Sequence, residues 1–311
     1  MNAARVVLLG PQFHDPTVGT VLKALKVKGP VGTITAGWQE LEAEDAGLQA
    51  QLGGRAVPLR LYERSERVWL SDPELRVEHA LLQNDLKALR ELYTSQLGHA
   101  ADAWVGLLET DGPDHLLQPE RQAALEAIQR LDAHLLDRIR AMRADFETRV
   151  GLHERDAVVR ARAHITADLE RVSTVVIEGG HVAVLLNRIA LFGLSDLLAG
   201  KTLLGCAAGA MALCSRVVLY DDSPAIGRGH AEVAVPGLGL APGVVALPDA
   251  VTRLRTEDPQ RMRKLALRLA PDRCALLDAR GWIAWDGTAW SGPGVSRVRA
   301  DGTLETWSRA A

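Results

Sequence analysis

The most informative part of this sequence is Gly205-Cys206-Ala207-Ala208-Gly209-Ala210. It ends the apolar run 202–206, which predicts a buried strand, and its small residues predict the start of a helix. A strand that turns sharply into a helix through Gly-x-X-x-Gly is typical of a nucleophile elbow, where the side chain at X is held in the open. In an active hydrolase X is Ser or Cys, but here X is Ala207. The sequence therefore predicts the architecture of a covalent hydrolase without its reacting atom.

The composition indicates a globular protein with a substantial core. The chain has 311 residues, of which 47% are hydrophobic, enough for one large domain with an insertion. The formal net charge is −3 and no long basic run occurs, so we expect no nucleic-acid partner. No apolar run reaches the roughly 20 residues of a membrane-spanning helix, so we expect no membrane partner. Three cysteines without a CxxC pair, and no signal-peptide pattern, predict a cytoplasmic protein.

Apolar runs that alternate with helical patterns predict an α/β fold. We expect strands at residues 5–9, 31–35, 56–61, 174–177, 202–206, 216–219 and 244–247, and one helix over 182–198. This alternation is typical of a parallel sheet with helices on both faces. Near the C-terminus we expect short antiparallel strands at 274–277, 282–285 and 295–299 and a last strand at 303–307, with turn signals at Asp286-Gly287 and Asp301-Gly302.

The strand pattern stops between residues 72 and 170. Leucines from Leu75 to Leu92, and apolar residues from Leu125 to Met142, recur at helical spacing. We therefore expect an α/β domain formed by residues 1–71 and 171–311, with a helical insertion at 72–170. The insertion is either a structural bundle, which we favour, or a cap over the active-site cleft. An apolar stripe left over would expose a large patch, so we expect a two-fold homodimer.

An ordered series of motifs resembles the serine peptidase family of peptidase E and cyanophycinase, within the class I glutamine amidotransferase-like fold. A strand ending in Gly-Gly at 177–180 precedes a helix and then the elbow. Further along lie Asp222, the motif Gly-Leu-Gly-Leu-x-Pro at 237–242, and Pro248 followed by Asp249. The resemblance covers residues 1–62 weakly and 172–311 well, whereas the insertion has no counterpart in it. It implies a flavodoxin-like three-layer sheet with a C-terminal β-meander.

The resemblance also implies that catalysis is lost. In the family a Ser attacks a carbonyl group and a His takes its proton. Here Ala207 stands at the Ser position and Asp249 at the His position, and no His lies beyond His230. We therefore expect a catalytically degenerate protein with a binding or assembly role.

Other matched positions imply a ligand site. Backbone N–H groups at Gly179, Gly180 and Ala208 would form the oxyanion hole, so a small carboxylate or peptide-like ligand is expected, although the glycines also suit a tight turn. His181, where the family has Asn or Asp, is a ligand contact or a helix cap. Asp222 matches an acidic position of the family, but an ordinary turn explains it as well.

Two alternatives remain. An active hydrolase or amidotransferase-like enzyme would use Cys206 as nucleophile with His181, although the residue before X belongs to the strand and points into the layers. A purely structural protein would use the insertion to form its dimer. No nucleotide-binding motif and no metal-ligand spacing occurs, so we expect neither a cofactor nor a metal.

Overall fold

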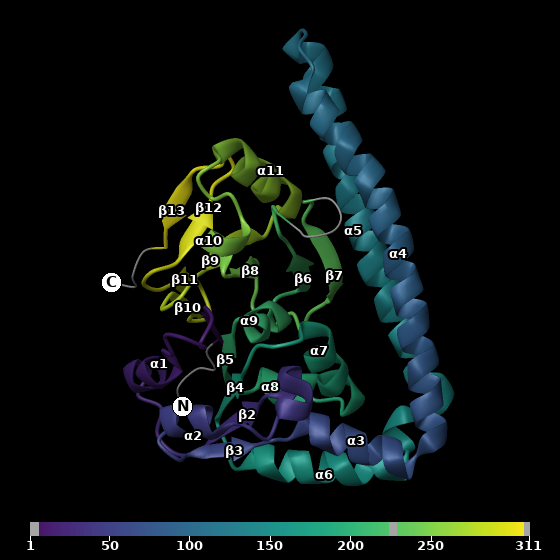
Figure 1. Cartoon of the computed structure of the whole chain (residues 1–311), viewed down its shortest axis with the longest axis vertical. Helices are drawn as coiled ribbons and strands as arrows, with labels where there is room; N and C mark the ends of the chain where they lie inside the picture. Colours follow the sequence, from purple (N-terminus) through teal and green to yellow (C-terminus); the bar gives the residue numbers. More distant parts are fainter. Residues whose placement is uncertain (1–5, 224–228, 308–311) are drawn as a thin grey trace.

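A mixed α/β body lies beside a long helical hairpin (Figure 1). The computed structural model describes residues 6–223 and 229–307. The chain enters the body, leaves it to form the hairpin, and returns to complete the sheets.

The centre of the body is a seven-stranded, mostly parallel sheet. Its order is β11-β10-β1-β5-β4-β2-β3, with β1, β5, β4, β2 and β3 parallel and β10 and β11 antiparallel at one edge. Its apolar, β-branched runs suit strands buried on both faces. The strands are β1 (Val6–Leu9), β2 (Val31–Ile34), β3 (Ala56–Pro58), β4 (Thr174–Ile177), β5 (Thr202–Cys206), β10 (Trp282–Trp285) and β11 (Trp290–Ser291).

Helices cover both faces of this sheet. On one face α1 (Val18–Ala24) and α2 (Ala46–Gln51) bury Leu22 and Leu48 against the strands. The other face packs against the larger core, which includes helix residues such as Leu185. Further helices of the body are η1 (Ala36–Leu41), α3 (Leu61–Ser71), η2 (Leu152–Glu154), α6 (Asp156–Glu170), α7 (Val182–Leu191), α8 (Ser195–Ala199) and α9 (Ala208–Leu213).

Two local predictions need correction. The helix expected over 182–198 divides into α7 and α8, because Gly193 adopts a left-handed φ of 57° that ends α7. The strand expected at 56–61 ends at Pro58, and α3 begins three residues later.

The C-terminal strands do not form one meander. The second sheet has the order β13-β12-β9-β8, with β8 parallel to β9, whereas β10 and β11 join β1 in the central sheet. Pairing with β10 covers an edge of β1 that would otherwise expose its backbone groups. The elements are β6 (Arg216–Leu219), β7 (Glu232–Pro236), β8 (Val244–Pro248), α10 (Ala250–Arg253), α11 (Pro259–Leu269), β9 (Arg273–Leu277), β12 (Ser296–Val298) and β13 (Leu304–Thr306), and β6 pairs with β7 alone.

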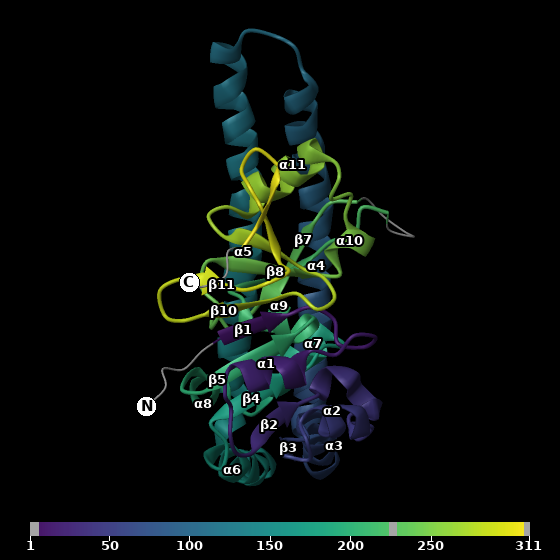
Figure 2. The same cartoon turned by 90° about the vertical axis from the view of Figure 1, so that its left-hand side faces the viewer.

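The hairpin consists of α4 (Pro73–Glu109) and α5 (Asp114–Val150), each of 37 residues. At about 1.5 Å per residue each helix is roughly 55 Å long. The hairpin passes along the side of the body and projects beyond it at its free end (Figures 1 and 2).

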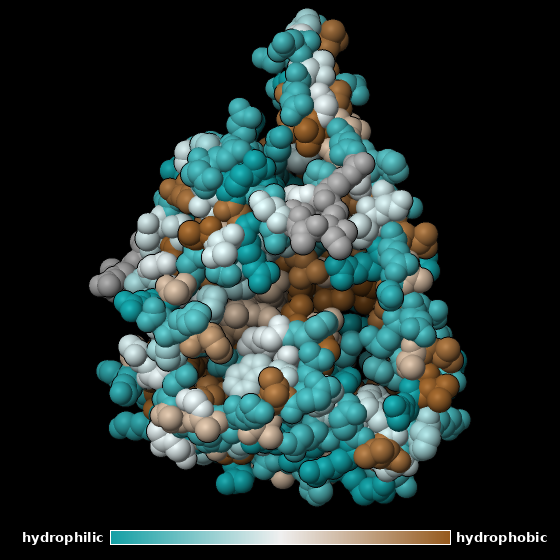
Figure 3. Space-filling model, viewed as in Figure 1, coloured by the Kyte–Doolittle hydropathy of each residue, from teal (hydrophilic) through white to brown (hydrophobic). Residues whose placement is uncertain are grey.

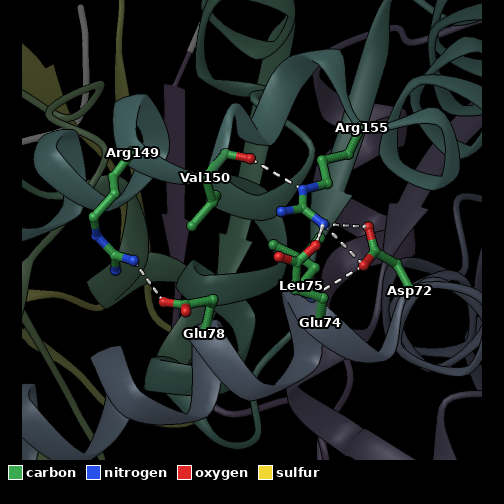
Figure 4. Close-up of polar contacts among 7 residues, drawn as sticks. All are labelled: Asp72, Glu74, Leu75, Glu78, Arg149, Val150 and Arg155. Carbon is green, nitrogen blue, oxygen red and sulfur yellow. Dashed lines mark hydrogen bonds and ion pairs between the residues drawn. The ribbon is translucent and has the colours of Figure 1, made fainter.

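Ion pairs close the base of the hairpin (Figure 4). Asp72 caps α4 by accepting a hydrogen bond from the Leu75 N–H at 3.0 Å. Arg155 donates to Asp72 at 3.0 Å and to the Val150 carbonyl at 3.0 Å. The Asp72 carboxylate therefore satisfies the start of α4 while Arg155 satisfies the end of α5.

A buried polar network joins the middle of the hairpin to the body. Asp132 of α5 and Arg268 of α11 pair at 3.0 Å, with side chains only 2% and 6% exposed. The Tyr93 hydroxyl of α4 donates to Asp132 at 2.6 Å and accepts from the Val233 N–H of β7 at 3.1 Å. Because every partner is satisfied inside the protein, the network fixes both hairpin helices against β7 and α11.

The apolar stripe of α5 is buried within one chain, whereas Leu81 and Leu92 of the α4 stripe are exposed. Ile128, Leu135 and Ile139 are at most 2% exposed, and they belong to the same core as Leu75 and Leu82. The stripe at 125–142 therefore leaves no large patch to cover, which removes the reason given for a dimer through this helix. The homodimer itself stays a prediction.

None of the helices in the described part of the chain has the length and hydropathy of a membrane span.

We predict that Asp132→Ala strongly destabilises the protein. Loss of the carboxylate leaves the Arg268 guanidinium buried and unpaired, which costs about 3–5 kcal/mol. Asp137→Ala on the same helix is the matched control, because its pair with Arg140 is more than half exposed and such pairs contribute less than about 1 kcal/mol. Urea unfolding of both variants measures the difference. Equal losses would contradict the anchoring role of the network.

Candidate functional site

Ala207 occupies a strained turn at the carboxyl end of β5. Its φ of 48° and ψ of −114° are unusual for a residue with a side chain and cost about 1–3 kcal/mol. Close packing holds the turn, because a Cβ on Gly209 would lie 2.0 Å from the Ile177 carbonyl oxygen. The Ala207 N–H donates to the Leu9 carbonyl at 3.0 Å, which ties the turn to β1.

A cleft of about 1280 Å³ lies over this turn. Figure 3 shows the hollow between the body and the hairpin, with hydrophobic residues inside it. Its lining from the body includes Gly180, Ala207, Ala208, Tyr220, Pro248 and Asp249, and its lining from α4 includes Lys87, Arg90, Glu91, Thr94, Ser95 and Gly98. The carboxyl ends of parallel strands are where ligands bind in open α/β sheets.

The structure brings together half of the positions singled out in the sequence. Ala207, Ala208, Gly180 and Asp249 line the cleft. The other four, Gly179, Cys206, His181 and Asp222, are not among its lining residues.

The Gly179-Gly180 turn lies directly beside the elbow. A Cβ on Gly179 would lie 3.2 Å from the Ala207 Cβ, and one on Gly180 would lie 2.3 Å from the Gly37 carbonyl oxygen. Among residues 6–223 and 229–307, the N–H groups of Gly180 and Ala208 donate to no protein acceptor. The floor of the cleft therefore carries backbone donors with free hydrogen-bonding capacity.

His181 serves as the N-cap of α7. Its Nδ1 accepts a hydrogen bond from the Val184 N–H at 3.3 Å, and the residue is exposed outside the cleft. Of the two readings of His181, these contacts favour the helix cap.

The two acidic positions have different surroundings. The Asp222 side chain is 3% exposed and accepts from Arg261 at 2.6 Å and from the Arg255 N–H at 2.8 Å, so its carboxylate is committed to the turn. Asp249 follows β8 with a left-handed φ of 59°, and its carboxylate accepts from the Thr252 hydroxyl at 2.9 Å. Its side chain is 44% exposed.

Cys206 is an unfavourable nucleophile. Its side chain is fully buried beside Glu178, and burial raises the pKa of the thiol well above its usual value, an effect that the neighbouring carboxylate strengthens. The thiolate is the reactive form of cysteine, so this environment suppresses reactivity.

Sequence reasoning missed two features of the site. Burial raises the pKa of Glu178 to about 7, partly opposed by hydrogen bonds from Cys206 and the Gly179 N–H. The available signal was Glu178, a carboxylate directly after the β-branched run 174–177. The second feature is the polar face of α4, which lies more than a hundred residues from Ala207 in the sequence.

The arrangement offers binding groups rather than a metal centre. In the described ranges no three His, Cys, Asp or Glu side chains are grouped as a metal ion requires. The cleft combines backbone donors at its floor with charged and hydroxyl side chains on its α4 side.

Comparison with solved structures finds a distant likeness. No protein-family model matches the sequence, and no curated protein matches it. Among solved structures the chain is similar to the crystal structure of a peptidase from an acI-B1 Actinobacterium, with a TM-score of 0.46 and 12% identity over 99% of this chain and 96% of that one. A likeness this distant assigns neither a function nor a role to any residue.

We predict that Glu178→Gln changes how stability depends on pH. A folded pKa of about 7, against an ordinary 4.5, means that the folded state retains a proton which the unfolded state releases. The protonated Glu178 side chain therefore stabilises the folded state fully below pH 4.5. This stabilisation is lost as pH rises through 7, which lowers the free energy of unfolding by about 3 kcal/mol. Glutamine does not titrate, so the variant gains stability over the wild type from pH 5 to pH 8.

Unfolding free energies at pH 5, 6.5 and 8 measure this effect, with the exposed Glu170→Gln on α6 as the control. If Glu178→Gln and the wild type keep a constant difference across this range, Glu178 does not titrate near neutrality.

Proposed function

We propose that this chain is a catalytically degenerate relative of the peptidase E and cyanophycinase family, with the flavodoxin-like core of that family. In this proposal residues 72–170 form an insertion in the α/β domain, and the cleft binds a small carboxylate or peptide-like ligand without cleaving it. The observation that carries the proposal is Ala207, which keeps the strained backbone of an elbow at the floor of a cleft but has only a methyl group.

Two further observations support binding without hydrolysis. The free N–H groups of Gly180 and Ala208 suit a carboxylate or carbonyl oxygen, since backbone donors do not depend on the missing side chain. The Asp249 carboxylate at the family's His position bonds Thr252, and a carboxylate accepts a proton from a hydroxyl much less readily than an imidazole does.

We predict that N-acetylaspartate, which carries carboxylates and an amide, binds the wild type and does not bind Ala207→Met. The longer, unbranched side chain would occupy the floor of the cleft. Calorimetric titration measures binding, and Ala141→Met, an exposed change on α5, is the control. Equal binding by wild type and Ala207→Met would move the ligand away from the elbow, and no binding by the wild type would refute this ligand class.

We also predict that Ala207→Ser does not gain hydrolysis of aspartyl dipeptides. A lone nucleophile lacks the base that takes its proton, and in a serine hydrolase the loss of one such group costs about 10⁶ in rate. Product release is followed by mass spectrometry, with Ala207→Ser/Asp249→His as the comparison. Turnover by the single variant above the wild-type background would contradict the degenerate assignment.

The alternative with Cys206 as nucleophile is tested by alkylation of the native protein. All three cysteines are buried, so we expect labelling only after unfolding. Rapid native labelling mapped to Cys206 would favour an active enzyme.

A further inference from the structure

One face of α4 is turned into the cleft. Eight α4 residues line the cleft, and we call six of them the α4 wall: Lys87, Arg90, Glu91, Thr94, Ser95 and Gly98; the other two are Leu97 and His99. The spacing of the six, three and one along the helix, puts them on a single face. These six residues are polar or glycine, whereas Leu97, which also lines the cleft, is buried in the core with Leu82 and Tyr93.

The α4 wall is held in position without a ligand. Arg90 pairs with Glu232 of β7 at 3.2 Å across the cleft, and Tyr93 is locked by Asp132 and the Val233 N–H. A surface that is ordered in advance loses less conformational freedom when a ligand binds.

The wall also has unused hydrogen-bonding capacity. In the described part of the chain Lys87 and Glu91 form no ion pair, whereas Arg90 pairs with Glu232 and Arg253 with Asp249. Lys87 supplies donors and Glu91 supplies acceptors one helical turn apart, and the Ser95 hydroxyl follows. Neighbouring donors and acceptors match the N–H and C=O groups of an amide chain.

The length of the α4 wall indicates how long a bound amide chain would be. Lys87 to Gly98 spans eleven residues of helix, or about 16 Å. An extended peptide rises about 3.3 Å per residue, so roughly five residues cover the wall and a dipeptide covers less than half of it. The cleft, at about 1280 Å³, exceeds the roughly 300–1,000 Å³ typical of small-molecule pockets.

We propose that the α4 wall determines specificity and selects an extended peptide segment of about five residues. The proposal rests on the proposed ligand-binding function of the cleft and adds the length and chemistry of the ligand. The hairpin would then provide half of the binding site, and the elbow would hold one carboxylate or carbonyl group of the bound chain.

The test compares random dipeptide and random pentapeptide libraries, recovered on the purified protein and counted by mass spectrometry. We expect the wild type to retain pentapeptides at least about tenfold more than dipeptides, and Lys87→Ala/Ser95→Ala to lose about that factor, the size expected for lost hydrogen bonds. Both residues are exposed, so the fold should be kept. Arg76→Ala, an exposed cation of α4 outside the cleft, is the matched control.

Equal retention of both libraries by the wild type, or undiminished pentapeptide retention by Lys87→Ala/Ser95→Ala, would overturn the proposal. Binding of N-acetylaspartate distinguishes a failure of the α4-wall proposal from a failure of the ligand-binding function. If it binds the wild type and Lys87→Ala/Ser95→Ala alike while no length preference exists, only the role of the α4 wall fails. If the wild type retains neither N-acetylaspartate nor either library, the ligand-binding function fails with it.

Discussion

The buried pair of Asp132 and Arg268 is the interaction on which the arrangement of this protein depends. Two charges removed from water are tolerated only when they are paired and hydrogen-bonded, and here Tyr93 completes the set. The three side chains come from α5, α11 and α4, so the hairpin cannot move from the body without leaving a buried charge unpaired. Hydrophobic contacts alone would allow the hairpin to slide along the body, whereas this network fixes the hairpin at one position.

This position of the hairpin on the body creates the cleft. The carboxyl ends of β4 and β5 form an open edge in the α/β body, and α4 stands opposite it as a second side. Arg90 and Glu232 join the two sides at 3.2 Å. The hairpin, which the sequence pattern favours as a structural bundle, thus contributes polar groups to the candidate site.

The floor of the cleft combines backbone strain with a methyl side chain at Ala207. Ala207 keeps a costly backbone conformation, and Gly209 allows α9 to approach β4 closely enough to enforce it. Beneath the turn, burial keeps the Cys206 thiol protonated and raises the pKa of Glu178 to about 7. The floor therefore presents backbone donors to the cleft, while the side chains of Cys206 and Glu178 lie below the surface.

Elements with a local residue pattern could be predicted from the sequence. The buried runs at 174–177 and 202–206, the turn at Ala207 and the two helical stripes of the hairpin follow from residue periodicity and small residues, which act within a few positions. Tertiary structure alone decided what those elements face. The partner of Asp222 is Arg261, the stripe at 125–142 is covered within one chain, and Lys87 reaches the cleft of Ala207. Each depends on packing between segments far apart in the chain, and no local pattern encodes the direction in which a helix face will finally be turned.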